Sequence, residues 1–282
     1  MLHDARPEDA GEIGNFLAKH SATSMFLRSN LAEFGTEPCD DPRSTRFVFS
    51  REKGEINAVA GLSQAGFLVL QAPENPAFLA ALKPAFKGRK LSGINGASQQ
   101  VEEALHAFGL NDAEFALRAP EPLYELPLSA LKIPDAPGNI RRATEADRAL
   151  LQAWILDYDT GTLGLPVNAD IRAQCARKVE ASIDSDRHVV LEVEGRAVAK
   201  TAFNAVLPDA VQIGGVYTPP ALRSKGYARL AVALHLAQAR TQGVEKAFLF
   251  SSSPDACRAY EAIGFRRIGS YSLAILKTAI EV

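Results

Sequence analysis

The most informative stretch of this chain is V-Y-T-P-P-A-L-R-S-K-G-Y-A, residues 216–228. A strand pattern over Ala210–Tyr217 stops before two prolines, and an Ala- and Leu-rich helix pattern runs from about Gly226 to Gln242. Because proline cannot extend a sheet ladder, we predict a strand, a turn and a helix in this order. A strand–helix–strand step of this kind opens a ligand crevice beyond the end of the first strand.

The turn itself has the composition of a phosphate-binding segment. Unpaired main-chain N–H groups at a helix N-terminus attract anions, and small residues allow a ligand to approach the backbone. Gly226 has no Cβ and tolerates a positive φ, Ala228 is nearly as small, and Arg223 and Lys225 add positive charge. Such a turn suits an anionic group that is bound mostly through the main chain.

The spacing of Pro220, Arg223, Gly226 and Ala228 resembles the coenzyme A signature of the GNAT superfamily, P-x-x-[RQ]-x-x-G-x-[GA]. The sequence departs from this pattern at Ser224, where a glycine is often found. The resemblance covers roughly residues 140–277 and implies an acetyl-coenzyme A-dependent N-acyltransferase, with the acetyl carbonyl held by the main chain of residues 216–218. It implies a coenzyme site made of Val216, Tyr217, Thr218, Arg223, Ser224, Lys225, Gly226, Tyr227 and Ala228.

A second pattern, S-x-x-A-x-x-x-Y-x-x-x-G-F, runs from Ser253 through Tyr260 to Phe265. It resembles a GNAT pattern that opens with asparagine, so Ser253 is a departure. The resemblance implies that Tyr260 points at the sulfur of the coenzyme and protonates the departing thiolate. The structural alternative is that Tyr260 only packs against the sheet.

Acyl transfer to an amine also requires a proton acceptor, since an alkylammonium cannot attack a thioester. The sequence points to no single residue. Glu192, Asp157 and Asp159 are candidates, and each is also consistent with an ordinary solvated acid. His188 and His235 stand alone among apolar neighbours without a nucleophile motif, and we assign them no role.

The order of predicted elements in the second half indicates a mixed α/β sheet covered by helices. We expect helices at about Arg142–Asp157, Asn168–Ile183 and Pro254–Ile263 in addition to the one after Gly226. Expected strands lie at His188–Val193, Arg196–Asn204, Ala210–Tyr217 and Ala247–Phe250, with two more, Phe265–Ile268 and Tyr271–Lys277, closing the chain. A turn-rich segment at 133–139 predicts a linker between a domain at 1–132 and a catalytic domain at 140–282.

The first half repeats the second faintly, which predicts tandem GNAT-like domains. Phe108-Gly109-Leu110 matches Ile263-Gly264-Phe265 at an offset of 155, which places Leu105 at the position of Tyr260. From Pro220 to Lys246 there are 26 residue steps, against 18 from Pro73 to Leu91, so about two helical turns are missing from the first copy. We infer that the first copy has lost the phosphate-binding turn.

Bulk composition sets limits on partners and location. A chain of 282 residues with 47% hydrophobic residues is large enough for two cores. The net charge of −2 and the absence of a basic, aromatic-rich run disfavour nucleic acid, and no apolar stretch approaches the length of a membrane span. Cys39, Cys175 and Cys257 are predicted to be reduced packing residues of a cytoplasmic protein, without a metal.

Together these features predict direct transfer of an acetyl group from acetyl-CoA to a primary amine of a small molecule or a peptide, with no metal cofactor. The alternatives are a non-catalytic acyl-CoA-binding regulatory module and a scaffold that binds no coenzyme. The acceptor, the acyl chain length and the oligomeric state have no signal in the sequence.

Overall fold

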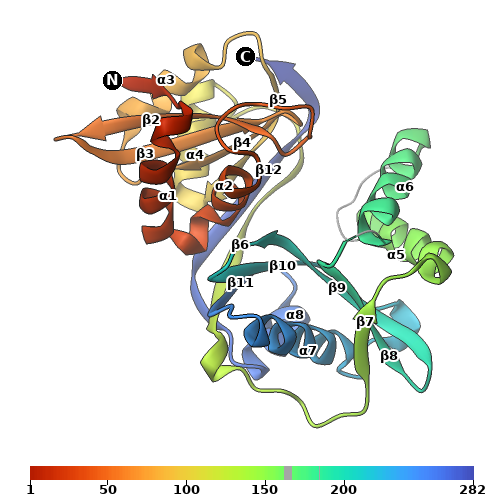
Figure 1. Cartoon of the computed structure of the whole chain (residues 1–282). Coiled ribbons are helices and arrows are strands. Elements are labelled where there is room, and N and C mark those ends of the chain that lie inside the picture. Colours follow the sequence, from red (N-terminus) through yellow and green to blue (C-terminus); the bar gives the residue numbers. More distant parts are fainter. Residues whose placement is uncertain (162–166, 184) are drawn as a thin grey trace. The chain divides into compact units, whose positions relative to one another are not determined.

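The computed structural model describes residues 1–161, 167–183 and 185–282, which form a mixed α/β structure of two compact units (Figure 1). Unit 1 consists of Met1–Leu123 together with Ile268–Val282, and unit 2 consists of Tyr124–Arg267. The predicted fold class, a mixed sheet with helices in a tandem arrangement, is confirmed.

In unit 1 the strand order is β1-β2-β3-β4-β5-β12, in which β4 and β5 are parallel and the β1–β2, β2–β3, β3–β4 and β5–β12 pairs are antiparallel. Its elements are β1 (Leu2–Asp4), α1 (Ala10–Lys19), α2 (Ser21–Phe34), β2 (Thr45–Glu52), β3 (Glu55–Ser63), β4 (Phe67–Gln71), α3 (Pro76–Ala85), β5 (Lys90–Ala97), α4 (Ser98–Phe108) and β12 (Arg266–Glu281).

Unit 2 holds the order β7-β8-β9-β10-β11-β6, in which β10 and β11 are parallel and β7, β8, β9 and β10 pair antiparallel in sequence. Its elements are the end of β6 (Phe115–Pro127), from residue 124 on, and β7 (Asn139–Arg142), α5 (Arg148–Gly161), α6 (Ala169–Ile183), β8 (His188–Val193), β9 (Arg196–Val206), β10 (Ala210–Tyr217), α7 (Tyr227–Thr241), β11 (Lys246–Phe250) and α8 (Pro254–Ala262).

Helices cover both faces of each sheet because successive strand side chains point to opposite faces. In unit 1, Phe47 and Phe49 join the core under α1 and α2, whereas Val48 joins the core under α3 and α4. In unit 2, Val190 lies in the core under α5 and α6, and Val211 lies in the core under α7 and α8. The sheets are therefore buried on both sides.

The sixth strand of each unit comes from the other half of the sequence. Tyr124, Leu126 and Leu128 are buried in the core of unit 2, and Ala274 and Leu276 are buried in the core of unit 1. The units thus differ from the expected domains 1–132 and 140–282, since 124–132 falls in unit 2 and 268–282 falls in unit 1. The cause is long-range burial of apolar side chains, which a local linker signal at 133–139 does not report.

The internal repeat is visible in matching helix ends. Gly109 follows α4 with φ 71°, and Gly264 follows α8 with φ 110°. The next residue closes each helix with the same bond, from Leu110 N to Leu105 O (2.8 Å) and from Phe265 N to Tyr260 O (3.2 Å). The hairpin turns also match, because Lys53-Gly54 and Glu194-Gly195 all have positive φ, as two-residue turns of this type require.

Several predicted boundaries need correction. The two short closing strands are one strand, β12, whose residues 271–275 pair with β5. The start of the helix expected at Arg142 is instead strand β7 and a 3₁₀ turn, Glu145–Asp147, so α5 begins at Arg148. The expected capping box of Thr144 and Asp147 is present on that turn. At α6 the expected cap is also present, because Ile171 N donates to Asn168 Oδ1 (2.9 Å).

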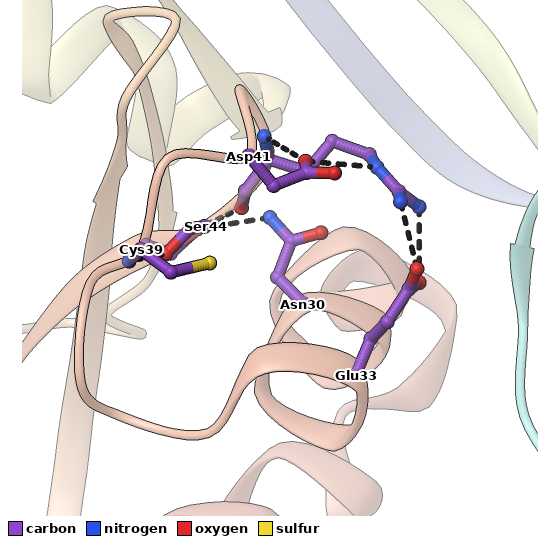
Figure 2. A network of polar contacts seen from close by, with 7 residues as sticks. Asn30, Glu33, Cys39, Asp41 and Ser44 are labelled. Carbon is purple, nitrogen blue, oxygen red and sulfur yellow. Dashed lines mark hydrogen bonds and ion pairs between the residues drawn. The ribbon is translucent and has the colours of Figure 1, made fainter.

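The three cysteines are free, but they do not share one environment. Cys175 is buried, whereas Cys39 is exposed on the loop after α2, which corrects its prediction as a packing residue. Figure 2 shows that this loop is held by polar contacts: Cys39 N donates to Ser44 Oγ (2.7 Å), and Arg43 pairs with Glu33 of α2 (2.7 Å). No described helix has the length and apolar character needed to cross a bilayer.

Candidate active site

A cavity of about 680 Å³ lies in unit 2 where β10 ends and α7 begins. It is lined by residues from α5, β10, the turn after β10, α7, β11 and α8, and by residues between β11 and α8. Of the predicted site residues, all but Lys225 line it: Val216, Tyr217, Thr218, Arg223, Ser224, Gly226, Tyr227, Ala228 and Tyr260. Sequence reasoning missed other lining residues, among them Tyr158, Arg229, Ser251 and Asp255.

The cavity opens because β10 leaves the sheet ladder near its end. The parallel pairs between β10 and β11 cover only Ala210 to Gln212 on β10. The antiparallel register with β9 shifts twice, between Gln212 and Ile213 and between Gly214 and Tyr217. Gly215, at the second shift, has φ 57°, a left-handed value that glycine adopts without strain. Residues 213–218 are thereby released from the pairing with β11 and line the cavity.

The turn before α7 has the geometry of an anion-binding nest. Ser224 and Gly226 both have positive φ, 62° and 78°, with Lys225 between them. Alternating backbone conformations of this kind bring successive N–H groups toward one point. Gly226 caps α7 without any side-chain hydrogen bond.

The main-chain donors of this turn are partly free. Among the described residues, none accepts a hydrogen bond from the N–H groups of residues 225–228. Arg223 N is already used, because it donates to Pro220 O (3.2 Å). The predicted coenzyme site includes every residue from 223 to 228. The free N–H groups belong only to residues 225–228, at the start of α7.

Two buried polar side chains at the cavity have no partner among the described residues: Thr218 through Oγ1 and Arg229 through Nε. Buried polar groups are normally hydrogen-bonded, so these two atoms fit a polar ligand. Arg229 directly follows Ala228, the last residue of the predicted coenzyme site, and this position in the sequence could have identified it as a lining residue. Arg223 instead donates from Nε to Thr218 O (3.1 Å), and Lys225 is exposed.

Tyr260 approaches the cavity from α8. Its helix is capped by Ser253, whose Oγ accepts from Ala256 N (3.4 Å), so the serine substitutes for the expected asparagine as a cap. Tyr260 is 7% exposed. Burial first, and then the nearby Tyr158 and Cys257, raise the pKa of its phenol. The hydroxyl therefore keeps its proton throughout the neutral range.

The three candidate proton acceptors have different surroundings. Glu192, on β8 two strands from β10, accepts from Arg141 (2.8 Å), which also pairs with Asp147. Asp159 is 1% exposed and accepts from Lys178 (2.8 Å). Asp157 is exposed and accepts from the hydroxyl of Tyr217, a lining residue. Only Asp157 contacts the cavity wall.

His235 is buried and His188 is half-buried, and both are neutral near pH 7. Burial lowers the pKa of His188 to about 4 and that of His235 to about 3. His235 stacks on Phe203 with ring centroids 3.7 Å apart.

Residues 150–265 match the sequence pattern of the Acetyltransferase (GNAT) family. The chain carries a GNAT acetyltransferase domain. The matched segment contains the whole cavity lining, from Tyr158 to Tyr260. No curated protein matches the chain significantly.

Solved structures resemble the whole chain, including the part outside the GNAT match. A GCN5-related N-acetyltransferase from Kribbella flavida is 19% identical over 93% of this chain and 96% of its own, with a TM-score of 0.60. A tandem GNAT protein from the clavulanic acid biosynthesis pathway is 12% identical over 98% of each chain, with a TM-score of 0.57. These likenesses show a shared tandem fold.

The GNAT domain supports an acyl-transfer activity, and the family generally uses acetyl-CoA. The residues present fit such a molecule, because the nest offers unpaired N–H groups to phosphates and the cavity holds orphaned polar atoms. The described residues contain no cluster of His, Cys, Asp or Glu that could hold a metal ion.

Proposed function

We propose that this protein transfers an acetyl group from acetyl-CoA to a primary amine by direct attack, using unit 2 alone as the coenzyme-binding unit. The observation that carries the proposal is the turn at residues 224–228, whose free N–H groups lie at the wall of a cavity that also contains Tyr260. The same cavity extends along the split end of β10. An extended ligand with a phosphate at one end and a thioester at the other fits this arrangement.

In this proposal each part of the cavity has one task. The N–H groups at the start of α7, with Arg229, bind the pyrophosphate. The main chain of residues 216–218 binds the amide-rich arm and donates to the thioester carbonyl as negative charge develops on its oxygen. Tyr260 donates its proton to the leaving thiolate, because its raised pKa keeps it protonated.

Asp157 is the proposed group that receives or orients the acceptor amine. One of its carboxylate oxygens accepts from Tyr217, and the residue is exposed at the end of α5 next to Tyr158. An exposed carboxylate at this place favours a cationic amine over a neutral acceptor and can accept a proton directly or through water. The proposed acceptor class is therefore a small-molecule or peptide amine that is positively charged in solution.

The test is an assay with acetyl-CoA and a panel of amines in which free thiol is monitored and the acetylated amine is identified by mass spectrometry. We expect thiol release that depends on one amine of the panel and yields one acetylated product. Tight coenzyme binding without thiol release from any amine would instead support the acyl-CoA-binding module. An absence of any thermal shift with acetyl-CoA or CoA would exclude both.

A further inference from the structure

Lys200 of β9 carries a positive charge into the interior of unit 2. The residue is 7% exposed, and its Nζ donates to the main-chain oxygen of Gly215 (2.9 Å). Burial lowers the pKa of its amine to about 8, so that it is mainly protonated at neutral pH. Burying an ammonium group is costly unless it is well bonded, so a specific role is expected at this position.

Unit 1 provides an internal comparison for this lysine. Lys200 pairs with Tyr217 at the end of β10, and Val59 pairs with Gln71 at the end of β4. Val59 is fully buried and apolar. The pairs of β3 with β4 run without a register shift, whereas those of β9 with β10 shift at Gly214–Tyr217. The lysine therefore occurs in the unit whose strand is bulged.

The bulge explains why a donor is needed. An irregularity in a ladder leaves a main-chain group without its strand partner, and the hydrogen bond from Lys200 satisfies the oxygen of Gly215. The peptide bond between Gly215 and Val216 is trans, so the N–H of Val216 points away from the oxygen that Lys200 binds. Gly215 and Val216 both line the cavity.

We propose that Lys200 is a positioning residue that fixes the Gly215–Val216 peptide so that the Val216 N–H donates to the thioester carbonyl. Lys200 itself does not touch the substrate. Its ammonium also polarises the peptide, which makes the N–H a stronger donor at the moment when charge develops on the carbonyl oxygen. This inference rests on the proposed function, because it assigns a task within the same cavity.

The experiment measures the carbonyl of bound acetyl-CoA directly and needs no acceptor amine. Acetyl-CoA labelled with ¹³C at the acetyl carbonyl is bound to the protein, and its ¹³C chemical shift and isotope-edited infrared stretch are recorded. The variants are Lys200→Met, which removes charge and donor, and Lys200→Gln, which keeps an N–H donor without charge. The matched control is Lys83→Met, because Lys83 Nζ also donates to a main-chain oxygen, that of Phe108 (2.9 Å), in unit 1.

In the wild-type protein we expect the bound carbonyl to be displaced from its free position in both spectra. Lys200→Met should lose most of this displacement and lower kcat about 10-fold or more, while acetyl-CoA affinity changes less than about 5-fold. Lys200→Gln should recover part of the displacement, and Lys83→Met should keep all of it.

A full displacement in Lys200→Met would overturn the inference. If Lys200→Met fails to fold, the Lys200→Gln variant tests the inference. A carbonyl displacement equal to that of the wild type in this variant would contradict a role for the positive charge of Lys200. If the wild-type protein binds no acetyl-CoA, the proposed function fails, and this outcome is distinct from a failure of the Lys200 assignment.

Discussion

The turn between strand and helix has the same place in the fold of each unit. The two turns differ in whether a side chain caps the helix that follows. In unit 1, β4 ends at Gln71 and α3 begins at Pro76, and the side chain of Asn75 accepts from Phe78 N (3.0 Å). In unit 2, β10 ends at Tyr217, α7 begins at Tyr227, and Gly226 provides no side-chain cap. A helix N-terminus becomes an anion site only where the protein leaves its N–H groups free.

The strands that precede these turns differ in the same direction. β4 pairs with β3 in a continuous register and also pairs with β5 up to Val69. Its last residue, Gln71, is 2% exposed and is hydrogen-bonded to Thr23 and Ser24. β10 shifts its register twice and lines a cavity. A longer turn and an irregular strand therefore distinguish the candidate site from the corresponding part of unit 1.

The strand exchange between the halves allows the most severe test of the comparison. A chain of residues 124–267 should fold, whereas a chain of residues 140–282 should not, because it lacks Tyr124, Leu126 and Leu128 of the unit 2 core. Each such buried side chain contributes about 1.5–3 kcal/mol, which together approaches the stability of a domain. Circular dichroism and thermal melting measure the difference. A cooperative transition for residues 140–282 would restore the sequence-based boundary.

Gly226→Asp should reduce CoA affinity at least about 100-fold, ~2.7 kcal/mol, because it places a like charge and a strained side chain at the nest. The control is Asn75→Asp, which adds the same charge at the start of α3 and can keep the cap. Titration calorimetry with CoA should show unchanged affinity for that control. Equal affinity for both variants would place the phosphates elsewhere.

Acid should destabilise unit 2 through its buried His235. The pKa of His235 is lowered by burial to about 3, so between pH 6.5 and 4.5 the unfolded chain binds a proton that the folded chain does not. Stability therefore falls as the pH falls through this window, by about 2 kcal/mol for this group. His235→Leu should remove that part of the loss. Urea unfolding at both pH values checks it, and identical pH dependence of the two proteins would contradict the assignment.

Tyr260→Phe should lower kcat about 10-fold, ~1.4 kcal/mol, with unchanged CoA affinity, because only the leaving thiolate loses its proton donor. Tyr124→Phe is the matched control. Its hydroxyl donates to Glu261 (3.0 Å) of the same helix, and it does not line the cavity. Steady-state kinetics on both variants separate catalysis from packing. Unchanged kcat in Tyr260→Phe would leave Tyr260 with the same packing role as Leu105.

The smallest effect is expected at two residues with strained backbones. Ser224 has φ 62° in the unit 2 turn, and Glu74 has φ 52° in the unit 1 turn. Replacing either by glycine relieves about 1 kcal/mol of strain and loses part of this gain to the entropy of the unfolded chain. Both variants should melt at the same or a slightly higher temperature, and both should keep CoA affinity within about 2-fold. A large loss of affinity in Ser224→Gly would show that the serine hydroxyl contacts the ligand.

Most of the residues named from the sequence line the cavity, and most of them are neighbours in the chain. The positive φ of Gly226 agrees with its expected place in the motif, and Ser224 also has a positive φ, which glycine adopts without strain. Tyr260 and the β10 residues were expected from the family resemblance, and the structure places them at one cavity. The occupied N–H of Arg223 and the outward position of Lys225 were not predictable, because both depend on the path of the turn.

The sequence alone determined the local elements, the repeat and the strand–turn–helix segment around Gly226, because helix periodicity, turn residues and small side chains act over a few positions. Only the tertiary structure decided the exchange of β6 and β12, the bond from Lys200 to the bulged strand, and the contact of Asp157 with Tyr217. Each of these joins residues far apart in the chain, and such contacts are selected by burial and by the satisfaction of polar groups in the complete fold.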